Sequence, residues 1–278
     1  MPYRLASMEI LFSPTLDSDL RKIFWNVFFK IKQRGVSLSR HFPWIDNPAG
    51  EAVFIRAVDS TTTVGGLVLR SRQMTVNGNA IKIGMIGLVC VREEDRGRGI
   101  SKILLSAAIE YARKEQFDYL TLWTSQHAIY EKFGFYTHDQ WLYGSVGAAG
   151  ESKATEVEEA YRTIFAEDES MPLPPYASKS YSYTDGKISI VLLEDAKGVI
   201  VADYQGNARE VAQFLALHLP AQWRLNITEN DPLLSELTLL EINHALVAVD
   251  LQMWLAVKES SAAKPFAENI IIPLLDRI

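Results

Sequence analysis

The sequence predicts an α/β protein: a mixed, mostly antiparallel sheet flanked by helices, followed by a second, smaller half of the same kind. Two observations support this fold class. Apolar residues recur at strand-like and helix-like spacing in alternating segments. The order strand, turn, helix, strand, short helix, strand occurs twice, which indicates an internal duplication. The chain has 278 residues, 48% of them hydrophobic, which is enough for two domains with real cores.

The first half contains the clearest signals of secondary structure. Asn77-Gly78 lies between two apolar runs and is typical of a tight hairpin turn. Gly84 and Gly87 lie inside the second run, where glycine indicates a bulge or a close approach of the backbone. The expected strands are 8–12, 52–58, 63–74, 81–91, 119–123 and a short one after 134, and the expected helices are 17–34, about 100–115 and a short one at 130–132.

A break in composition divides the chain. The small residues of 144–150 are followed by a charged, helix-prone stretch at 151–170 and a proline-rich turn. We therefore expect a first domain at 1–145, a linker or helical connection at 146–180, and a second domain at 181–278. For the second domain we expect strands at 188–193, 198–203, 223–227, 246–257 and 270–275, a helix at 208–219 and a short helix after Asp231.

Composition excludes several classes of protein. The formal net charge of −6 argues against a nucleic-acid-binding protein, which usually presents a basic face. The single cysteine, Cys90, excludes an intramolecular disulfide, and the scattered histidines show no metal-ligand spacing. The first residues lack the apolar core of a signal peptide, and no apolar run is long enough to span a membrane. We expect a cytoplasmic protein without a metal, a membrane partner or a nucleic-acid partner.

The segment 83–136 carries the strongest functional signal. An apolar strand leads through an acidic loop into Arg96-Gly97-Arg98-Gly99-Ile100-Ser101, where a helix begins. Glycines let the backbone approach an anion, and the first amides of a helix have no intrahelical partners. Arg96 and Arg98 add positive charge at the rim. The P-loop and dinucleotide-binding patterns are not met here, so the segment predicts another kind of phosphate-binding loop.

Two motifs together resemble those of a known family. R-x-x-G-x-[GA] after a strand, with Y-x-K-x-G-F about thirty residues later, is similar to the GNAT family of acyl-CoA-dependent N-acetyltransferases. The second motif here is Tyr130-Glu131-Lys132-Phe133-Gly134-Phe135. The resemblance covers about residues 8–143 and departs from the family pattern at Ser101, where glycine or alanine is preferred.

The resemblance implies roles for particular residues. The backbone of Leu88, Val89, Cys90 and Val91 would bind the pantetheine arm of acetyl-CoA, and the backbone amides from Arg96 through Gly97, Arg98, Gly99 and Ile100 to Ser101 would hold the pyrophosphate. Tyr130 would protonate the departing thiolate after direct attack by an amine. His127, three residues earlier, is a candidate base or acceptor contact.

The second half lacks these motifs. Where the first half has RGRGIS, the second has Tyr204-Gln205-Gly206-Asn207-Ala208-Arg209, and no Y-x-K-x-G-F follows. We interpret it as a degenerate GNAT-like half. The short approach to Tyr130 followed by a tandem second half is similar to the enhanced-intracellular-survival acetyltransferases, a similarity that supports only the tandem arrangement.

Other interpretations of the same residues stay open. Tyr130 also fits a tyrosine that only packs against its neighbours. Gly97 and Gly99 also fit an ordinary loop and helix start. Cys90 fits a buried apolar position better than a nucleophile, and the acidic run at 93–95 fits a solvated loop better than a general base.

The predicted function is acetyl transfer from acetyl-CoA to a primary amine of a small molecule or a protein. The alternative is a non-catalytic acyl-CoA sensor or interaction module, and a homodimer is left open.

Overall fold

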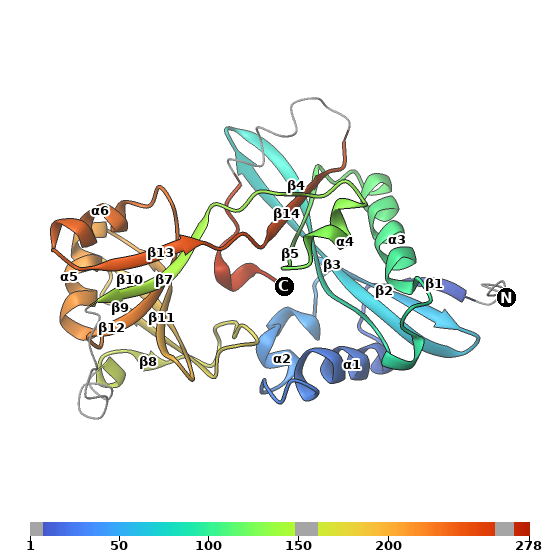
Figure 1. Ribbon diagram of the computed structural model, residues 1–278, viewed down its shortest axis with the longest axis horizontal. Coiled ribbons are helices and arrows are strands. Elements are labelled where there is room, and N and C mark those ends of the chain that lie inside the picture. Colours follow the sequence, from blue (N-terminus) through green and yellow to red (C-terminus); the bar gives the residue numbers. More distant parts are fainter. Residues whose placement is uncertain (1–7, 148–160, 259–269) are drawn as a thin grey trace. The chain divides into compact units, whose positions relative to one another are not determined.

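The computed structural model describes residues 8–147, 161–258 and 270–278. They form two compact units, each built on a seven-stranded mixed sheet with helices (Figure 1). The first unit comprises the described parts of Met1–His138, Leu251–Ile271 and Arg277–Ile278, and the second comprises those of Asp139–Asp250 and Ile272–Asp276. No helix in the described ranges is long and apolar enough to cross a membrane.

The first sheet has the strand order β1-β2-β3-β4-β5-β14-β6. Only β4 and β5 are parallel, and the other neighbours are antiparallel. The strands are β1 (Met8–Ser13), β2 (Ala52–Asp59), β3 (Thr62–Val76), β4 (Asn79–Val91), β5 (Tyr119–Trp123), β6 (Tyr136–Thr137) and β14 (Gln252–Ala256). The helices are α1 (Ser18–Trp25), its π-helical continuation η1 (Asn26–Lys30), α2 (Leu38–His41), η2 (Pro43–Ile45), η3 (Glu93–Asp95), α3 (Ile100–Lys114) and α4 (His127–Glu131).

The second sheet repeats this arrangement strand for strand. Its order is β8-β9-β10-β11-β12-β7-β13, and again only the fourth and fifth strands, β11 and β12, are parallel. The strands are β7 (Trp141–Gly147), β8 (Ala166–Glu167), β9 (Lys179–Thr184), β10 (Ser189–Asp195), β11 (Gly198–Gln205), β12 (Gln222–Thr228) and β13 (His244–Ala248). The helical segments are η4 (Tyr161–Thr163), α5 (Ala208–His218), α6 (Pro232–Leu239) and η5 (Leu274–Asp276). The predicted duplication and fold class are therefore confirmed.

The sequence specifies the ends of these elements through short-range contacts. The carboxylate of Asp17 accepts from the amides of Asp19 and Leu20 and begins α1. Asp231 caps α6 by accepting from the amide of Leu233, with Pro232 in the first turn. Asn77 and Gly78 both adopt positive φ, as a type I′ hairpin turn requires.

The two units exchange their sixth strands. β14, near the end of the chain, pairs with β5 and β6 in the first sheet, whereas β7 pairs with β12 and β13 in the second. The units are therefore not the continuous ranges 1–145 and 181–278 that the sequence suggested. The physical reason is that a strand's pattern fixes which face is buried but not which sheet receives it. Residues 148–160, which include much of the expected helical connection, lie outside the described residues.

Two expected strands of the second half need correction. The apolar run 246–257 is not one strand, because the chain leaves β13 after Ala248 and re-enters a strand at Gln252 in the other sheet. Asp250 between them has a φ of 58°, a left-handed conformation far from that of a regular strand. The run 270–275 does not form a strand either. Pro273 cannot donate to a sheet, and the residues after it form η5.

Helices cover both faces of the first sheet. On one face α3 packs its buried side into a cluster with β2, β3, β4 and β5. On the other face α1, η1 and α2 pack against β2, β3 and the end of β4. Side chains alternate along β4 between these faces: Ile86 and Val89 contact the α3 side, and Leu88 and Cys90 contact the α1 side. The end of β4 is therefore enclosed between two helical layers.

The strand exchange makes the first unit depend on residues near the end of the sequence. Trp254 of β14 is 1% exposed, packs edge-on against Tyr119 at 6.1 Å and donates from Nε1 to the carbonyl of His138. We expect Trp254→Ala to destabilise the first unit by about 3–5 kcal/mol, as is usual for a deleted buried aromatic ring. Hydrogen exchange of the β5 amides during denaturant unfolding measures this loss. Val247→Ala is the control, because Val247 is 68% exposed on β13; equal effects of both variants would contradict the exchanged pairing.

Candidate active site

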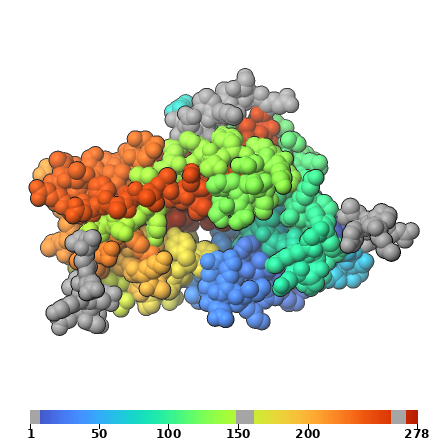
Figure 2. All heavy atoms as spheres, viewed as in Figure 1, coloured from blue at the N-terminus to red at the C-terminus, as the bar shows by residue number. Residues whose placement is uncertain are grey.

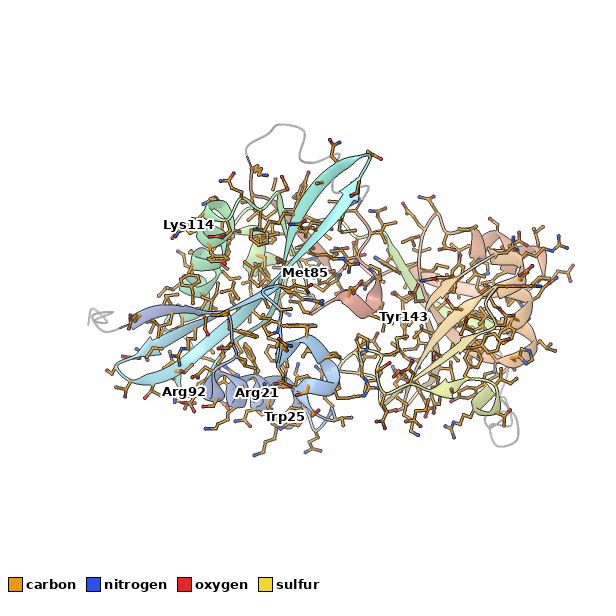
Figure 3. The ribbon with its side chains drawn as sticks, turned by 180° about the vertical axis from the view of Figure 1, so that it is seen from behind. Arg21, Trp25, Met85, Arg92, Lys114 and Tyr143 are labelled. Carbon is orange, nitrogen blue, oxygen red and sulfur yellow. The ribbon has the colours of Figure 1, made fainter. Side chains whose placement is uncertain are left out.

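β4 and β5 separate at the centre of the first sheet. Their pairing is limited to Ile83–Met85 of β4 and Tyr119–Thr121 of β5. Beyond Met85, β4 pairs with β3 at Ile86, Gly87, Cys90 and Val91 but not with β5. Figure 3 labels Met85, at the last pair, and Arg92, just beyond the end of β4. The backbone of β4 therefore presents an edge without a strand partner along Leu88, Val89, Cys90 and Val91, the residues predicted to bind pantetheine.

A bulge interrupts β4 within this edge. The register with β3 shifts between Gly66 and Val68, and Leu88 has a φ of 53°. A non-glycine residue in this region is strained and re-aims the backbone groups beside it. Gly87 lies next to the bulge, and a Cβ there would be 2.8 Å from the Ile278 side chain. Gly84 lets the side chain of Leu120 pack close against the backbone of β4, because a Cβ at Gly84 would lie 2.5 Å from that side chain. The glycines in the sequence predicted a bulge or a close backbone approach in this strand, but not that the bulge lies at Leu88.

The loop after β4 forms an open cradle at the start of α3. Gly97 and Gly99 have φ values of 79° and 76°, and a Cβ at either position would meet nothing within 4 Å. Gly99 is the N-cap of α3 and provides no side-chain cap. The first bonds to its carbonyl come from the amides of Lys102 and Ile103. The amides of Ile100 and Ser101 therefore remain for a ligand, and the helix dipole favours an anionic one.

The side chain of Asp95 pairs with Arg92 and Arg98 and so holds this loop in shape; this set of contacts is called the brace. Its side chain is 9% exposed and accepts from Nε of Arg92 at 2.9 Å and from Nη1 of Arg98 at 2.6 Å. Arg98 also donates to Asp59 at 2.5 Å. The Arg98 guanidinium therefore pairs with carboxylates, where the sequence had suggested a charge on the rim. Arg96 is exposed and makes no ion pair within the described ranges, so it is the cation left to meet a ligand.

Removing the charge of Asp95 tests the brace. We expect Asp95→Asn to weaken acetyl-CoA binding about tenfold, because the hydrogen bonds that order the loop lose the charge of their acceptor and act on the ligand only through the loop. Isothermal titration calorimetry measures the affinity. Asp19→Asn is the control, since Asp19 forms an exposed pair with Lys22 on α1. An unchanged affinity in Asp95→Asn would show that the loop keeps its shape without the brace.

Tyr130 lies on α4, on the same face of the sheet as α3. Its ring packs against the buried cluster that includes Ile100 and meets Phe135 edge-on at 6.1 Å. Burial raises the pKa of Tyr130, so the phenol stays protonated at neutral pH. Gly134, with a φ of 90°, ends the helix so that Phe135 enters the core. This geometry explains the spacing of the Y-x-K-x-G-F motif.

His127 begins α4, three residues before Tyr130. Its Nε2 atom is buried and has no hydrogen-bond partner within the described part of the chain. Nε1 of Trp123, at the end of β5, is buried and unpartnered in the same sense. Buried nitrogens without partners are costly, and they are often found where a ligand supplies the missing contact. No pattern in the sequence singled out Trp123.

Two further candidates are placed in structural roles. Cys90 is buried, and its burial raises the pKa of the thiol to about 12. Such a thiol does not ionise at neutral pH, which disfavours a covalent acyl-enzyme at this position. In the acidic run, Asp95 is occupied by the arginines, and Glu94 lies 3.5 Å from Arg92. The spacing of Arg92, Asp95 and Arg98, three residues apart each, is the signal that could have revealed the brace.

The second unit lacks an equivalent cradle. At the start of α5 the side chain of Asn207 accepts from the amides of Arg209 and Glu210, at 3.0 and 3.2 Å. The amide of Arg209, which corresponds to that of Ser101 in α3, is therefore used within the protein. Gly206 is also enclosed, because a Cβ there would lie 2.5 Å from the carbonyl oxygen of Lys187. The part of the chain that the structure describes holds no group of three His, Cys, Asp or Glu side chains suited to a metal ion.

Comparison with known proteins identifies this arrangement. Residues 24–138 match the family model of the acetyltransferase (GNAT) domain. Residues 24–138 form a GNAT acetyltransferase domain. This domain class comprises acyltransferases, and the open cradle, the bulged β4 and the separated β5 all lie in or next to the matched range. No curated protein matches the chain.

Solved structures share the fold over nearly the whole chain. Eis1 from Mycobacterium abscessus is 17% identical with a TM-score of 0.61, covering 92% of this chain and 74% of that one. The GCN5-related N-acetyltransferase from Kribbella flavida is 15% identical with a TM-score of 0.58, covering 90% and 71%. A tandem GNAT protein from the clavulanic acid biosynthesis pathway is 12% identical with a TM-score of 0.51, covering 92% and 100%. These likenesses concern the fold, and they agree with two GNAT-like halves in one chain.

Proposed function

We propose that the first unit transfers an acetyl group from acetyl-CoA to a primary amine. The observation that carries the proposal is the cradle of Gly97 and Gly99 at an uncapped α3, at the end of a strand whose edge lacks a partner. The uncapped amides suit a pyrophosphate, and the free edge of β4 suits the amide groups of pantetheine. Among the residues that act, Arg96 adds charge to the cradle and Tyr130 is the acid.

The chemistry needs no covalent enzyme intermediate. The neutral amine attacks the thioester carbonyl, and the oxyanion is stabilised by backbone amides near the Leu88 bulge. The carbon–sulfur bond then breaks, and Tyr130 donates its proton to the CoA thiolate. The amine loses a proton, for which His127 is the candidate acceptor, because its buried Nε2 has no partner within the described residues.

An acceptor panel tests this proposal. Purified protein, acetyl-CoA and individual primary amines are incubated, and the release of CoA thiol is followed together with the mass of the acceptor. We expect at least one primary amine to gain an acetyl group in step with thiol release. Tertiary amines of the same skeleton are the control, because they cannot form a stable amide. Thiol release without an acetylated acceptor would indicate hydrolysis and would contradict the proposal.

A second function follows from one specific feature. β4 between Ile83 and Val91 contains no carboxylate that could serve as a base. This absence keeps open a non-catalytic sensor that binds acyl-CoA and presents the second unit to a partner. The sensor shares the cradle with the enzyme, so the two differ only in turnover. A protein that binds acetyl-CoA yet acetylates no amine in the panel supports the sensor.

A further inference from the structure

A groove beside α3 is left unused by the proposed reaction. It has a volume of about 760 Å³ and lies between α3 and β1, which Figure 1 shows side by side. Its apolar lining comes from Ile103, Ala107 and Tyr111 of α3 and from Ile10 and Phe12 of β1. The three helix positions repeat every four residues and so form one stripe along α3.

The groove is rimmed by an aromatic side chain that faces solvent. Phe12 is 45% exposed and stacks on Tyr111 at 5.5 Å, with the rings only 20° from parallel. Tyrosine is enriched at protein interfaces, because its ring is apolar while its hydroxyl can stay hydrated. Residues of α3 form part of the molecular surface in Figure 2, so a partner can reach the helix from outside.

A charged stripe lines the same groove and shows which partner fits. Lys102, Ser106, Glu110 and Lys114 repeat every four residues along α3. Lys102 and Glu110 are both exposed, and their side chains make no ion pair within the described ranges. They are two helical turns apart, about 12 Å along the axis, so they cannot pair with each other. Ser106, small and half-buried, lies midway between them.

We propose that a second copy of this chain docks on this face through α3. A two-fold axis at Ser106 runs the two helices antiparallel and places Lys102 of each copy opposite Glu110 of the other. A two-fold interface must be self-complementary, and Lys102 and Glu110, opposite charges four residues to either side of the small Ser106, meet that condition. Ala107, beside the axis, permits close approach of the helices, and the groove accepts apolar side chains of the other copy.

Charge reversal tests the proposal through the oligomeric state. Sedimentation equilibrium of the wild type over a concentration series is expected to show a dimer, with twice the mass of the 31.3 kDa chain. Lys102→Glu and Glu110→Lys each place like charges opposite each other, so each is expected to weaken dimerisation at least tenfold. The double variant Lys102→Glu/Glu110→Lys restores both pairs in reverse and is expected to dimerise again. Lys187→Glu, the same charge change at an exposed position of the second unit, is the control and is expected to leave the dimer intact.

The outcomes separate this proposal from the proposed function. A monomeric wild type, single variants that stay dimeric, or a double variant that stays monomeric each overturn the α3 dimer. None of these results depends on acetyl-CoA or on turnover. Lys102 and Glu110 are exposed, so all variants are expected to fold, which circular dichroism checks. Phe12→Glu places a charge in the apolar groove and is expected to break the dimer independently of the ion pairs.

Discussion

Replacement of Tyr130 by phenylalanine is expected to lower kcat by about 10²- to 10⁴-fold, the range associated with a lost general acid. The variant keeps the ring that packs against Phe135 and removes only the hydroxyl. CoA thiolate must then leave without a proton from the enzyme. The affinity for acetyl-CoA is expected to stay unchanged, because the cradle residues on α3 are not altered. Steady-state kinetics and calorimetry on the same preparation measure both quantities.

The pH dependence adds a second readout to this experiment. Burial raises the pKa of Tyr130 above its ordinary value of 10, so the acid form persists through neutral and mildly alkaline pH. Wild-type kcat is therefore expected not to fall between pH 7 and about pH 9 through loss of this proton. Tyr183→Phe, in the second unit, is the matched control and is expected to retain full turnover. Equal turnover in Tyr130→Phe and wild type would contradict the role of Tyr130.

The largest effect on binding is expected from Gly99→Asp. The φ of 76° at Gly99 is unfavourable for any side chain, and a carboxylate there would compete with a phosphate for the first amides of α3. We expect the affinity for acetyl-CoA to fall by about 100-fold or more, the equivalent of two lost charge-assisted hydrogen bonds. Calorimetric titration of acetyl-CoA measures the change.

A second glycine provides the matched control for this substitution. Gly78 has a φ of 78° and open space around its Cβ position, as Gly99 does, but it lies in the hairpin turn between β3 and β4. Gly78→Asp thus introduces the same charge and the same backbone strain away from the cradle. Its affinity for acetyl-CoA is expected to equal that of the wild type. If both variants lose affinity alike, the loss comes from destabilisation and not from the cradle.

Local signals predicted the cradle and most of the elements. The glycines of RGRGIS, the strand before them and the amphipathic helix after them lie within about thirty residues. Such short-range features are fixed by backbone conformation and helix periodicity, which a sequence displays directly. The positive φ values of Gly97 and Gly99 and the start of α3 at Ile100 agree with that prediction. The roles of individual residues in binding and catalysis stay predictions.

Features that depend on distant residues were not predictable in the same way. β7 and β14 are short strands that mix apolar and polar residues, and nothing in their residues specifies the sheet that they join. The pairing of Arg98 with Asp59 joins residues 39 positions apart, so the sequence suggested a free cation where the structure has a paired one. The strain at Leu88 arises from a register shift against β3, which becomes visible only once the strands are paired.

The two halves share a fold but differ at one helix start, which explains why we expect a functional site in the first half and not in the second. Both sheets have the same order and the same parallel pair at their centre. They differ where the central helix begins: Gly99 has no side chain to cap α3, whereas the side chain of Asn207 accepts from two amides in the first turn of α5. A single side chain thus distinguishes an anion-binding helix start from a capped one.

The number of acetyl-CoA sites per chain tests this account most directly. Calorimetric titration of the wild type gives that number together with the affinity. We expect saturable binding at one site per chain, because only the first half has an open cradle. Two sites per chain would show that the Asn207 cap does not close the second half. No saturable binding would contradict the cradle itself, and with it both the enzyme and the sensor.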